Sequence, residues 1–234
     1  MESILHFSEL ASTNTYLKIN CSVFEDRTVV VADTQTAGRG RFDRQWISQE
    51  GGLYFSVLLK PSKVDFAANF TQLMALSVCR AAEDLGVKVT LKWPNDVLAD
   101  GKKLCGILSE AVAQGEQISC VIVGCGVNVE QQDVSSVGQP AVSLANLGVS
   151  VSRRAFLRSI LAYFWQEYPL VEEKGFAVLR GAYLRRFDCI GKTLRIKNGT
   201  EDITGVATGI SEKGTLLIDG NNGPEEILIG DVVL

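Results

Sequence analysis

Residues 38–46 read GRGRFDRQW and place three arginines and two glycines within nine positions. Glycine lets a backbone turn and approach a ligand closely, and the arginine guanidinium pairs with carboxylate or phosphate through parallel hydrogen bonds. Only Asp43 offsets the three arginines, so this segment is positive although the whole chain carries a net charge of −4. The segment is a candidate loop for a small anionic ligand, rather than a nucleic-acid track, and a solvated glycine-rich turn is the alternative.

Basic and polar side chains also gather around two motifs farther along the chain. Residues 92–96 read KWPND, and residues 99–102 (ADGK) carry a turn signal just before Lys103. A hairpin with this turn places Lys92, Asn95, Asp96 and Lys103 at nearby levels. Residues 124–128 read GCGVN, and glycines at alternate strand positions indicate close approach of a ligand, with room for a ring.

These residues suit chemistry that works by positioning and by neutralising charge. The motifs place no nucleophile beside a base, and the single histidine, His6, lies between Leu5 and Phe7 in a strand-like segment. A carboxylate that attacks the α-phosphate of ATP meets negative charge, and clustered arginines and lysines offset that repulsion. We therefore predict the ATP-dependent activation of a carboxylic acid.

The elements before residue 90 position these motifs. Residues 3–7, 28–32 and 53–59 are predicted strands, and residues 28–32 lead through Gln35 into the arginine-rich segment. Ser12, Thr13 and Asn14 precede apolar residues at helical spacing, which predicts a helix N-cap or, alternatively, a helix end that binds a polar ligand head. Residues 66–85 are predicted to form a long core helix that ends at Gly86.

The second half continues the same pattern of strands and helices. Residues 87–91 are strand-like, and a second hairpin turns at residues 114–116 and runs out to residue 129. Residues 152–173 predict a helix capped by Ser152, followed by a shorter helix over residues 176–187.

Short strands dominate the last part of the chain, at residues 193–197, 202–210, 215–219, 225–229 and 232–234. Turn signals separate them at Asn198-Gly199, Lys213-Gly214 and Asp219-Gly220. A small β barrel of this size buries too little surface to stand alone, so it should pack on the main domain. We place the boundary between residues 1–187 and residues 188–234.

Composition restricts the class of protein. The chain has 234 residues, 46% hydrophobic and 21% charged, which is ordinary for a globular protein. It contains no apolar run long enough to cross a bilayer and no signal-peptide pattern, so we expect a cytoplasmic protein without membrane contact. Six cysteines without a C-x-x-C pair are interpreted as reduced thiols rather than as a disulfide or zinc framework.

Five segments in this order resemble those of biotin protein ligases: Ser12-Thr13-Asn14, residues 35–41 (QTAGRGR), 92–96 (KWPND), 103–108 (KLCGIL) and 124–128 (GCGVN). The resemblance implies an α+β fold of the class II synthetase-like type, with a mixed sheet flanked by helices and a C-terminal SH3-like barrel. Repressor-type members carry an N-terminal helix-turn-helix. The chain begins at the catalytic domain, so it resembles the non-regulatory type and no DNA partner is expected.

What the resemblance implies chemically is a two-step ligase. Biotin and ATP with Mg²⁺ give biotinyl-5'-AMP, and a lysine of a biotin carboxyl carrier domain then takes the biotinyl group. The implied catalytic residues are Lys103, Arg41 and Asp96, with Asp96 orienting or deprotonating the acceptor lysine or, alternatively, capping a turn. Asn95 and Asp96 fall where the family places metal or acceptor contacts, and no set of side chains is predicted to fix a metal.

The ligand contacts implied by the resemblance fall into two groups. The biotin-binding group is Ser12, Thr13, Asn14, Gln35, Gly38, Arg39, Gly40, Arg41, Lys103 and Gly106. The nucleotide-binding group is Arg39, Arg41, Arg44, Trp46, Lys92, Asn95, Lys103 and Asn128. The loop would close over the adenylate because a mixed anhydride hydrolyses when water reaches it.

Two other functions compete with this interpretation. A lipoate-protein ligase shares the fold and the adenylation chemistry, but its glycine-rich loop differs from GRGR. A biotin-binding regulator without turnover is the other alternative, and Lys103 argues against it. The sequence leaves open whether the chain forms a homodimer and which carrier it modifies.

Overall fold

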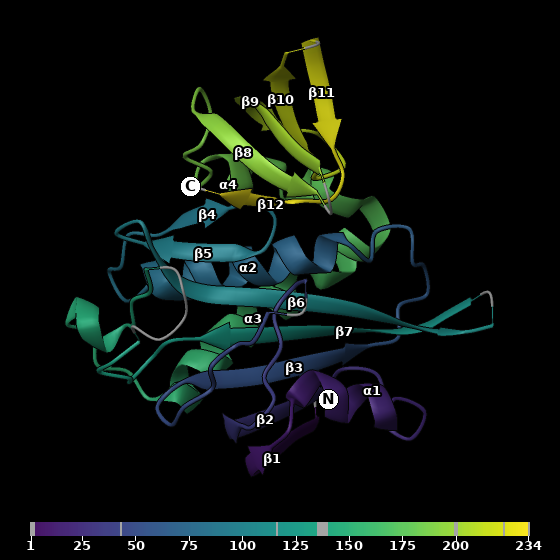
Figure 1. The fold of residues 1–234 in the computed structure, drawn as a ribbon. Helices are drawn as coiled ribbons and strands as arrows, with labels where there is room; N and C mark the ends of the chain where they lie inside the picture. The colour runs from purple at the N-terminus through teal and green to yellow at the C-terminus, as the bar shows by residue number, and fades with distance from the viewer. Residues whose placement is uncertain are drawn as a thin grey trace.

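The computed structural model describes residues 3–42, 44–115, 117–134, 140–198, 201–221 and 223–233. Within these residues a seven-stranded sheet has the order β1-β2-β3-β7-β6-β5-β4 (Figure 1). The first two strands are parallel and the remaining neighbours are antiparallel, so the sheet is mixed. The strands are β1 (Ser3–Leu10), β2 (Thr28–Gln35), β3 (Leu53–Leu59), β4 (Thr90–Lys92), β5 (Asp96–Ala99), β6 (Lys102–Gln114) and β7 (Gln117–Val127).

Helices cover both faces of this sheet. The long helices α2 (Asn69–Glu83) and α3 (Arg153–Lys174) lie on one face, and α1 (Thr13–Asn20) lies on the other (Figure 1). Strand β3 is buried at every position because both of its faces are covered. The α1 face has its own apolar cluster around Leu17 and Leu58, whereas the α2 and α3 face contains the main core.

Several caps and turns lie where the sequence predicted them. Ser12 caps α1, with its side chain accepting from the backbone N–H of Thr15, and Ser152 caps α3 in the same way. The ADGK turn joins β5 to β6, with Asp100 and Gly101 both at positive φ. The second hairpin joins β6 to β7, although Glu116 of its turn lies outside the described residues.

The expected helix over residues 176–187 is wrong as one continuous element. The chain instead forms a 3₁₀ turn, η2 (Gly175–Val178), and a short helix, α4 (Arg180–Leu184). The rings of Phe176, Tyr183 and Phe187 are all buried, and the irregular path brings all three into the core. The core helix α2 and strand β4 are also shorter than the predicted residues 66–85 and 87–91.

The last part of the chain forms a five-stranded antiparallel sheet of order β11-β10-β9-β8-β12 among the described residues, consistent with an SH3-like domain. Its strands are β8 (Thr193–Asn198), β9 (Glu201–Ile210), β10 (Leu216–Gly220), β11 (Gly223–Ile227) and β12 (Asp231–Val233). Lys213 and Gly214 form a turn, as expected. The turn predicted at Asp219 and Gly220 is wrong, because both residues continue β10 and Gly220 pairs with Gly223. Gly199 of the predicted Asn198-Gly199 turn and Leu234 of the predicted last strand lie outside the described residues.

The turn at residues 211–215, between β9 and β10, packs on the large domain through polar groups. The indole N–H of Trp93 and the amide of Gln72 both donate to the carbonyl of Gly214, at 3.0 and 2.6 Å. Asn69 donates to the carbonyl of Lys213 at 3.0 Å. These bonds seat the 211–215 turn on α2 and on the loop that precedes β5.

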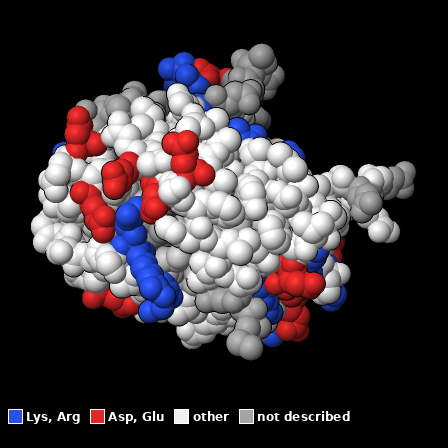
Figure 2. All heavy atoms as spheres, turned by 90° about the horizontal axis from the view of Figure 1, so that it is seen from below, with Lys and Arg blue, Asp and Glu red and all other residues white. Residues whose placement is uncertain are grey.

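The remaining expectations concern cysteine, histidine and surface charge. All six cysteines are free thiols, and His6 lies in β1 with its ring nitrogen 3.1 Å from the Asp33 carboxylate. Helices within the described residues are too short or too polar to span a membrane. On the face seen in Figure 2, basic side chains lie beside acidic ones and much of the surface carries neither charge.

Candidate active site

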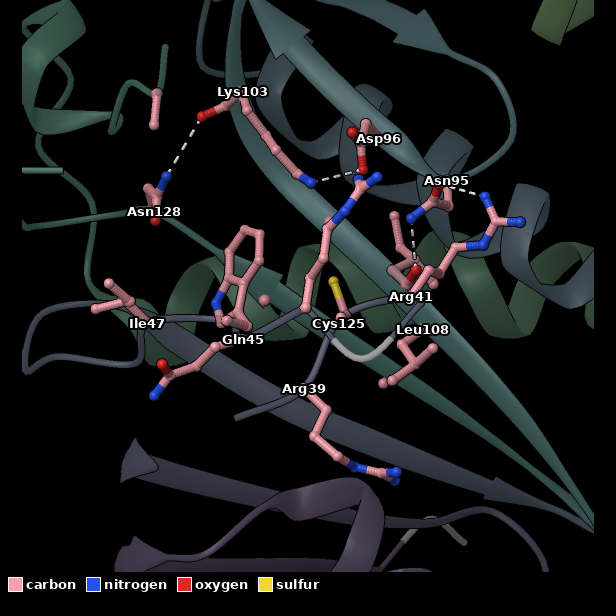
Figure 3. A pocket seen from close by; sticks show the side chains of 18 of the residues that line it. Arg39, Arg41, Gln45, Ile47, Asn95, Asp96, Lys103, Leu108, Cys125 and Asn128 are labelled. Atoms are coloured by element: carbon pink, nitrogen blue, oxygen red, sulfur yellow. Dashed lines mark hydrogen bonds and ion pairs between the residues drawn. The ribbon is translucent and has the colours of Figure 1, made fainter. Parts of the chain in front are cut away.

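A cavity of about 770 Å³ lies between the arginine-rich loop, the hairpins of the large sheet and the edge of the small sheet (Figure 3). Most of the predicted site residues line it: Ser12, Asn14, Gln35, Arg39, Gly40, Arg41, Arg44, Trp46, Lys92, Asn95, Asp96, Lys103, Gly106 and Asn128. Thr13 and Gly38 are not lining residues. The volume is typical of a site for a small organic ligand.

The floor of the cavity carries an ion cluster held by the β4–β5–β6 hairpins. The ammonium of Lys103 lies 2.9 Å from the carboxylate of Asp96, and the ammonium of Lys92 lies 3.7 Å from it. All three side chains are largely buried. Two lysines around one carboxylate leave a net positive charge, and burial strengthens its field because the local dielectric constant is low.

The loop over the cavity is closed by its own backbone. The carbonyl of Gly38 accepts from the N–H of Trp46 at 2.9 Å, and the carbonyl of Arg44 accepts from the N–H of Gly40 at 2.6 Å. A β-carbon at position 38 would lie 2.4 Å from the Trp46 carbonyl oxygen. Gly38 is therefore required for this turn although it does not line the cavity. Asp43 lies outside the described residues.

Each arginine of the loop has a partner on a different element. Arg39 donates to the carboxylate of Glu110 on β6 at 2.6 Å and points away from Lys103 and Asp96 in Figure 3. Arg41 donates to the backbone carbonyl of Gly230 at 2.8 Å and to the Asn95 side chain at 3.4 Å. Arg44 pairs with Asp231 at the start of β12.

Burial lowers the pKa of the Arg41 guanidinium, and the carboxylates of Asp231 and Asp96 oppose that shift. An arginine pKa starts so high that the group keeps its charge at neutral pH. The Arg41 charge therefore sits, partly desolvated, beside the Asp96 cluster, which is where charge neutralisation is most effective.

A polar network fills the opposite end of the cavity, at the start of α1. Gln35 accepts from the backbone N–H of Thr13 at 2.8 Å and donates to Ser48 at 2.8 Å. The hydroxyl of Ser56 donates its one hydrogen to the Asn14 amide oxygen at 2.6 Å and lies 2.7 Å from the Thr13 hydroxyl. Ser12 serves as the N-cap, as predicted, and it also lines the cavity. Binding of a polar ligand head at this helix end stays a prediction.

The alternate glycines make room for side chains of the chain itself. A β-carbon at Gly126 would lie 2.5 Å from the indole nitrogen of Trp46, and one at Gly124 would lie 2.0 Å from the Asn14 amide oxygen. The ring expected beside these glycines is therefore, in this structure, the Trp46 indole. The Lys103 ammonium lies 5.3 Å from the centre of the same indole, within cation–π range.

Asn128 lies at the cavity edge with its amide already engaged. It donates to the carbonyls of Lys103 and Val142, both at 3.3 Å, so it holds the start of β6 in place.

The sequence analysis missed Ser56, Glu110 and Asp231. A signal for Glu110 existed, because it shares strand parity with the cavity-lining residues Gly106 and Leu108. Asp231 is distant in sequence from every motif and carried no such signal.

The family pattern described as Biotin/lipoate A/B protein ligase matches residues 7–128, and the pattern of the biotin protein ligase C terminal domain matches residues 189–234. The first match covers more than half of the chain. The chain belongs to the biotin protein ligase family. The resemblance found in the sequence is thus confirmed, and so is the expected fold class.

Named relatives and solved structures agree with this membership. The chain is 36% identical to the bifunctional ligase/repressor BirA of Bacillus subtilis, and the match covers 88% of this chain and 66% of that protein. It is 32% identical to the biotin--[acetyl-CoA-carboxylase] ligase of Paracoccus denitrificans, over 87% of this chain and 88% of that one. The Aquifex aeolicus biotin protein ligase, solved with biotin and ATP, is 34% identical with a TM-score of 0.88 over 99% of this chain and 97% of its own.

Proposed function

We propose that the chain activates biotin with ATP as biotinyl-5'-AMP and transfers the biotinyl group to a lysine of a biotin carboxyl carrier domain. The observation that carries this proposal is that one cavity has a neutral polar network at one end and buried cations at the other. Biotin has a polar ureido head and a carboxylate tail, and ATP supplies the phosphates, so one bound pair matches both ends of the cavity. The name of the Paracoccus denitrificans relative states the same reaction class.

The ureido end of biotin would lie against the network of Ser12, Thr13, Asn14 and Gln35. Both hydrogens of the Asn14 amide are used, toward the Leu108 carbonyl at 3.1 Å and the Glu110 carboxylate at 3.0 Å. The Asn14 oxygen accepts from Ser56 with one lone pair, and its second lone pair is left to accept from a ligand N–H. Thr13 lies behind the lining and acts through Gln35 and Ser56.

The carboxylate end of biotin and the α-phosphate of ATP would meet at Lys103 and Arg41, close to Lys92. The step forms a bond between the biotin carboxylate oxygen and the α-phosphorus, and pyrophosphate leaves with its electron pair. Attack brings two anions together, and cations already fixed in place lower the barrier without moving at the moment of reaction. Arg44, Trp46, Asn95 and Asn128 would complete the nucleotide side. Arg39, which the resemblance assigns to both groups of contacts, is held by Glu110 at the polar end of the cavity.

Mg²⁺ would enter with ATP and offset phosphate charge, as in other nucleotide-using enzymes. Asp96 offers the kind of carboxylate oxygen that Mg²⁺ prefers, and it faces the cavity beside Asn95. No cluster of three or more His, Cys, Asp or Glu side chains able to hold a metal occurs in the described part of the chain. Phosphate oxygens of ATP and water would be further ligands.

In the second step the amine of the carrier lysine attacks the biotinyl carbonyl carbon, forms an amide and displaces AMP. The amine must lose protons, and we propose that Asp96 orients it and receives one. Its carboxylate lies beside the ammonium groups of Lys92 and Lys103 and lines the cavity in which the amine would arrive. The alternative is that Asp96 only positions Lys103.

Several broader expectations are carried as proposals. We propose that the chain divides between residues 1–187 and 188–234, and that it works in the cytoplasm, where ATP is made and thiols such as the six free cysteines stay reduced. The absence of DNA and membrane partners stays a prediction from the sequence. Whether the chain forms a homodimer stays open.

The deciding experiment mixes the purified chain with biotin, MgATP and a biotin carboxyl carrier domain, followed by mass spectrometry of the carrier. The expected result is one added biotinyl group on one lysine, dependent on ATP. Lipoate in place of biotin separates the two ligase functions. A carrier that stays unmodified while biotin still binds would leave a regulator without turnover as the function.

A further inference from the structure

The three arginines of the 38–46 loop are each fastened at a different place around the cavity. Arg39 is held by Glu110 on β6 of the large sheet, and Arg44 is held by Asp231 on β12 of the small sheet. Between them, Arg41 donates to the Gly230 carbonyl and to Asn95. The loop therefore spans the cavity between two carboxylates that the chain itself supplies.

We propose that Glu110 and Asp231 are positioning residues that latch this loop shut, one on each side of the cavity, and so set how long the adenylate is retained. The inference rests on the proposed function for its ligand. The geometry of the latch does not depend on which ligand is bound. Each arginine uses only part of its five donors in the latch.

Glu110 ties the loop to the polar end of the cavity. One carboxylate oxygen accepts from Arg39 at 2.6 Å and from the Asn14 amide at 3.0 Å, and the other lies 3.4 Å from the Lys18 ammonium. The carboxylate is much less exposed than either cation, so it is shielded from salt. A shared oxygen means that the atom holding the loop also orients the amide that faces the ligand.

Asp231 ties the other end of the loop to the small sheet. Its side chain is only 10% exposed, and its strand is fixed by pairing with Lys197 on β8. The Gly230 carbonyl, just before this strand, accepts from Arg41, so two successive residues hold two arginines of the loop. The small sheet is thus part of the cavity wall and of the closing device, beyond its packing on α2.

These contacts differ from ordinary surface ion pairs, which contribute little because both partners are solvated. Here each carboxylate is mostly buried, with Glu110 16% and Asp231 10% exposed, although Arg39 and Arg44 are about half exposed and solvent screens part of the attraction. A charge-assisted hydrogen bond of this kind changes an equilibrium by on the order of tenfold. Loss of either anchor should raise the open fraction of the loop, and the rate of adenylate loss, by about that factor.

The test uses the full chain with Glu110→Gln, Asp231→Asn and the double substitution, which keep shape and remove charge. The matched control is Asp202→Asn, because Asp202 pairs with Arg195 inside the same small sheet and away from the cavity. One readout is the rate of trypsin cleavage after Arg39, Arg41 and Arg44 without ligand. The other is the rate at which preformed biotinyl-5'-AMP leaves the protein on gel filtration.

The expected result is about tenfold faster cleavage and adenylate loss for each single variant, more for the double, and parent rates for Asp202→Asn. Asp231→Glu should restore slow release, which a loss of folding would not allow. If Asp231→Asn fails to fold, Arg44→Gln breaks the same pair from the loop side. Parent-like cleavage in Glu110→Gln and Arg44→Gln would overturn the latch, whereas absence of any adenylate in the parent would instead overturn the proposed function.

Discussion

Replacing Gly124 with alanine should displace the amide of Asn14 and weaken biotin binding. Gly124 lies on β7 directly between Ser56 of β3 and Leu108 of β6, the two residues whose hydroxyl and carbonyl hold that amide. The new β-carbon would lie 2.0 Å from the Asn14 oxygen and 2.7 Å from its Cγ. β3 and β6 are each paired on both sides within the sheet, so the amide has to move.

The size of the effect follows from the bonds that the movement breaks. Relief of the contact requires a shift of more than about 1 Å, and the Asn14 bonds at 2.6, 3.0 and 3.1 Å do not survive such a shift. Loss of these bonds, one of them to a carboxylate, costs about 2–4 kcal/mol of folding free energy. For a chain of this length the melting temperature should fall by roughly 4–16 °C. Biotin affinity should fall about tenfold to a hundredfold, because the ligand loses a buried hydrogen bond.

Isothermal titration with biotin and a thermal melt of the same preparation measure both quantities. Gly181→Ala is the matched control, since the nearest atom to its β-carbon is the Arg185 guanidinium at 3.8 Å and the position lies in helix α4. That control should bind biotin like the parent and gain up to about 1 kcal/mol of stability from helix propensity. A Gly124→Ala protein that binds biotin as tightly as the parent would refute the placement of the Asn14 amide.

Three further predictions concern the charged groups. Arg41→Ala should release free biotinyl-5'-AMP and weaken biotin binding about tenfold, measured by filtration of the labelled adenylate; undiminished retention would contradict the clamp. Asp96→Asn should lower transfer to the carrier by about 10²-fold or more while biotin-dependent ATP–pyrophosphate exchange changes little, whereas an equal loss in both steps would reduce Asp96 to a support for Lys103. Burial acts to raise the pKa of Glu110, but hydrogen bonds from Asn14 and Arg39 outweigh it and the pKa is lowered, so its stabilisation is complete above about pH 4.3 and is lost as the pH falls through the lowered value. The stability difference between the parent and Glu110→Gln, measured by urea unfolding, should accordingly shrink below pH 4, and a constant difference would contradict this assignment.

The parts of the site that lie within one hairpin or one cap were predictable. The ADGK turn required β5 and β6 to pair, and this pairing brings Lys103 to 2.9 Å from Asp96. Ser12 announced the start of α1 because a hydroxyl before an apolar helix satisfies its free N–H groups. The prediction of one helix over residues 176–187 was wrong because the path of this segment is not set locally. It depends on how Phe176 and Tyr183 fit a core built by distant elements.

The sequence alone determined the order of most strands and helices, because turns, caps and hydrophobic periodicity are local properties of the chain. Its motifs also carried the resemblance to the family and most of the cations that line the cavity, although not Lys197. Only the tertiary structure decided what each glycine makes room for and which group holds each arginine. Gly126 accommodates Trp46, and Asp231 meets Arg44, across long stretches of intervening chain. Such contacts join elements that are distant in the chain, and no local pattern specifies them, because they are fixed by the packing of all the elements together.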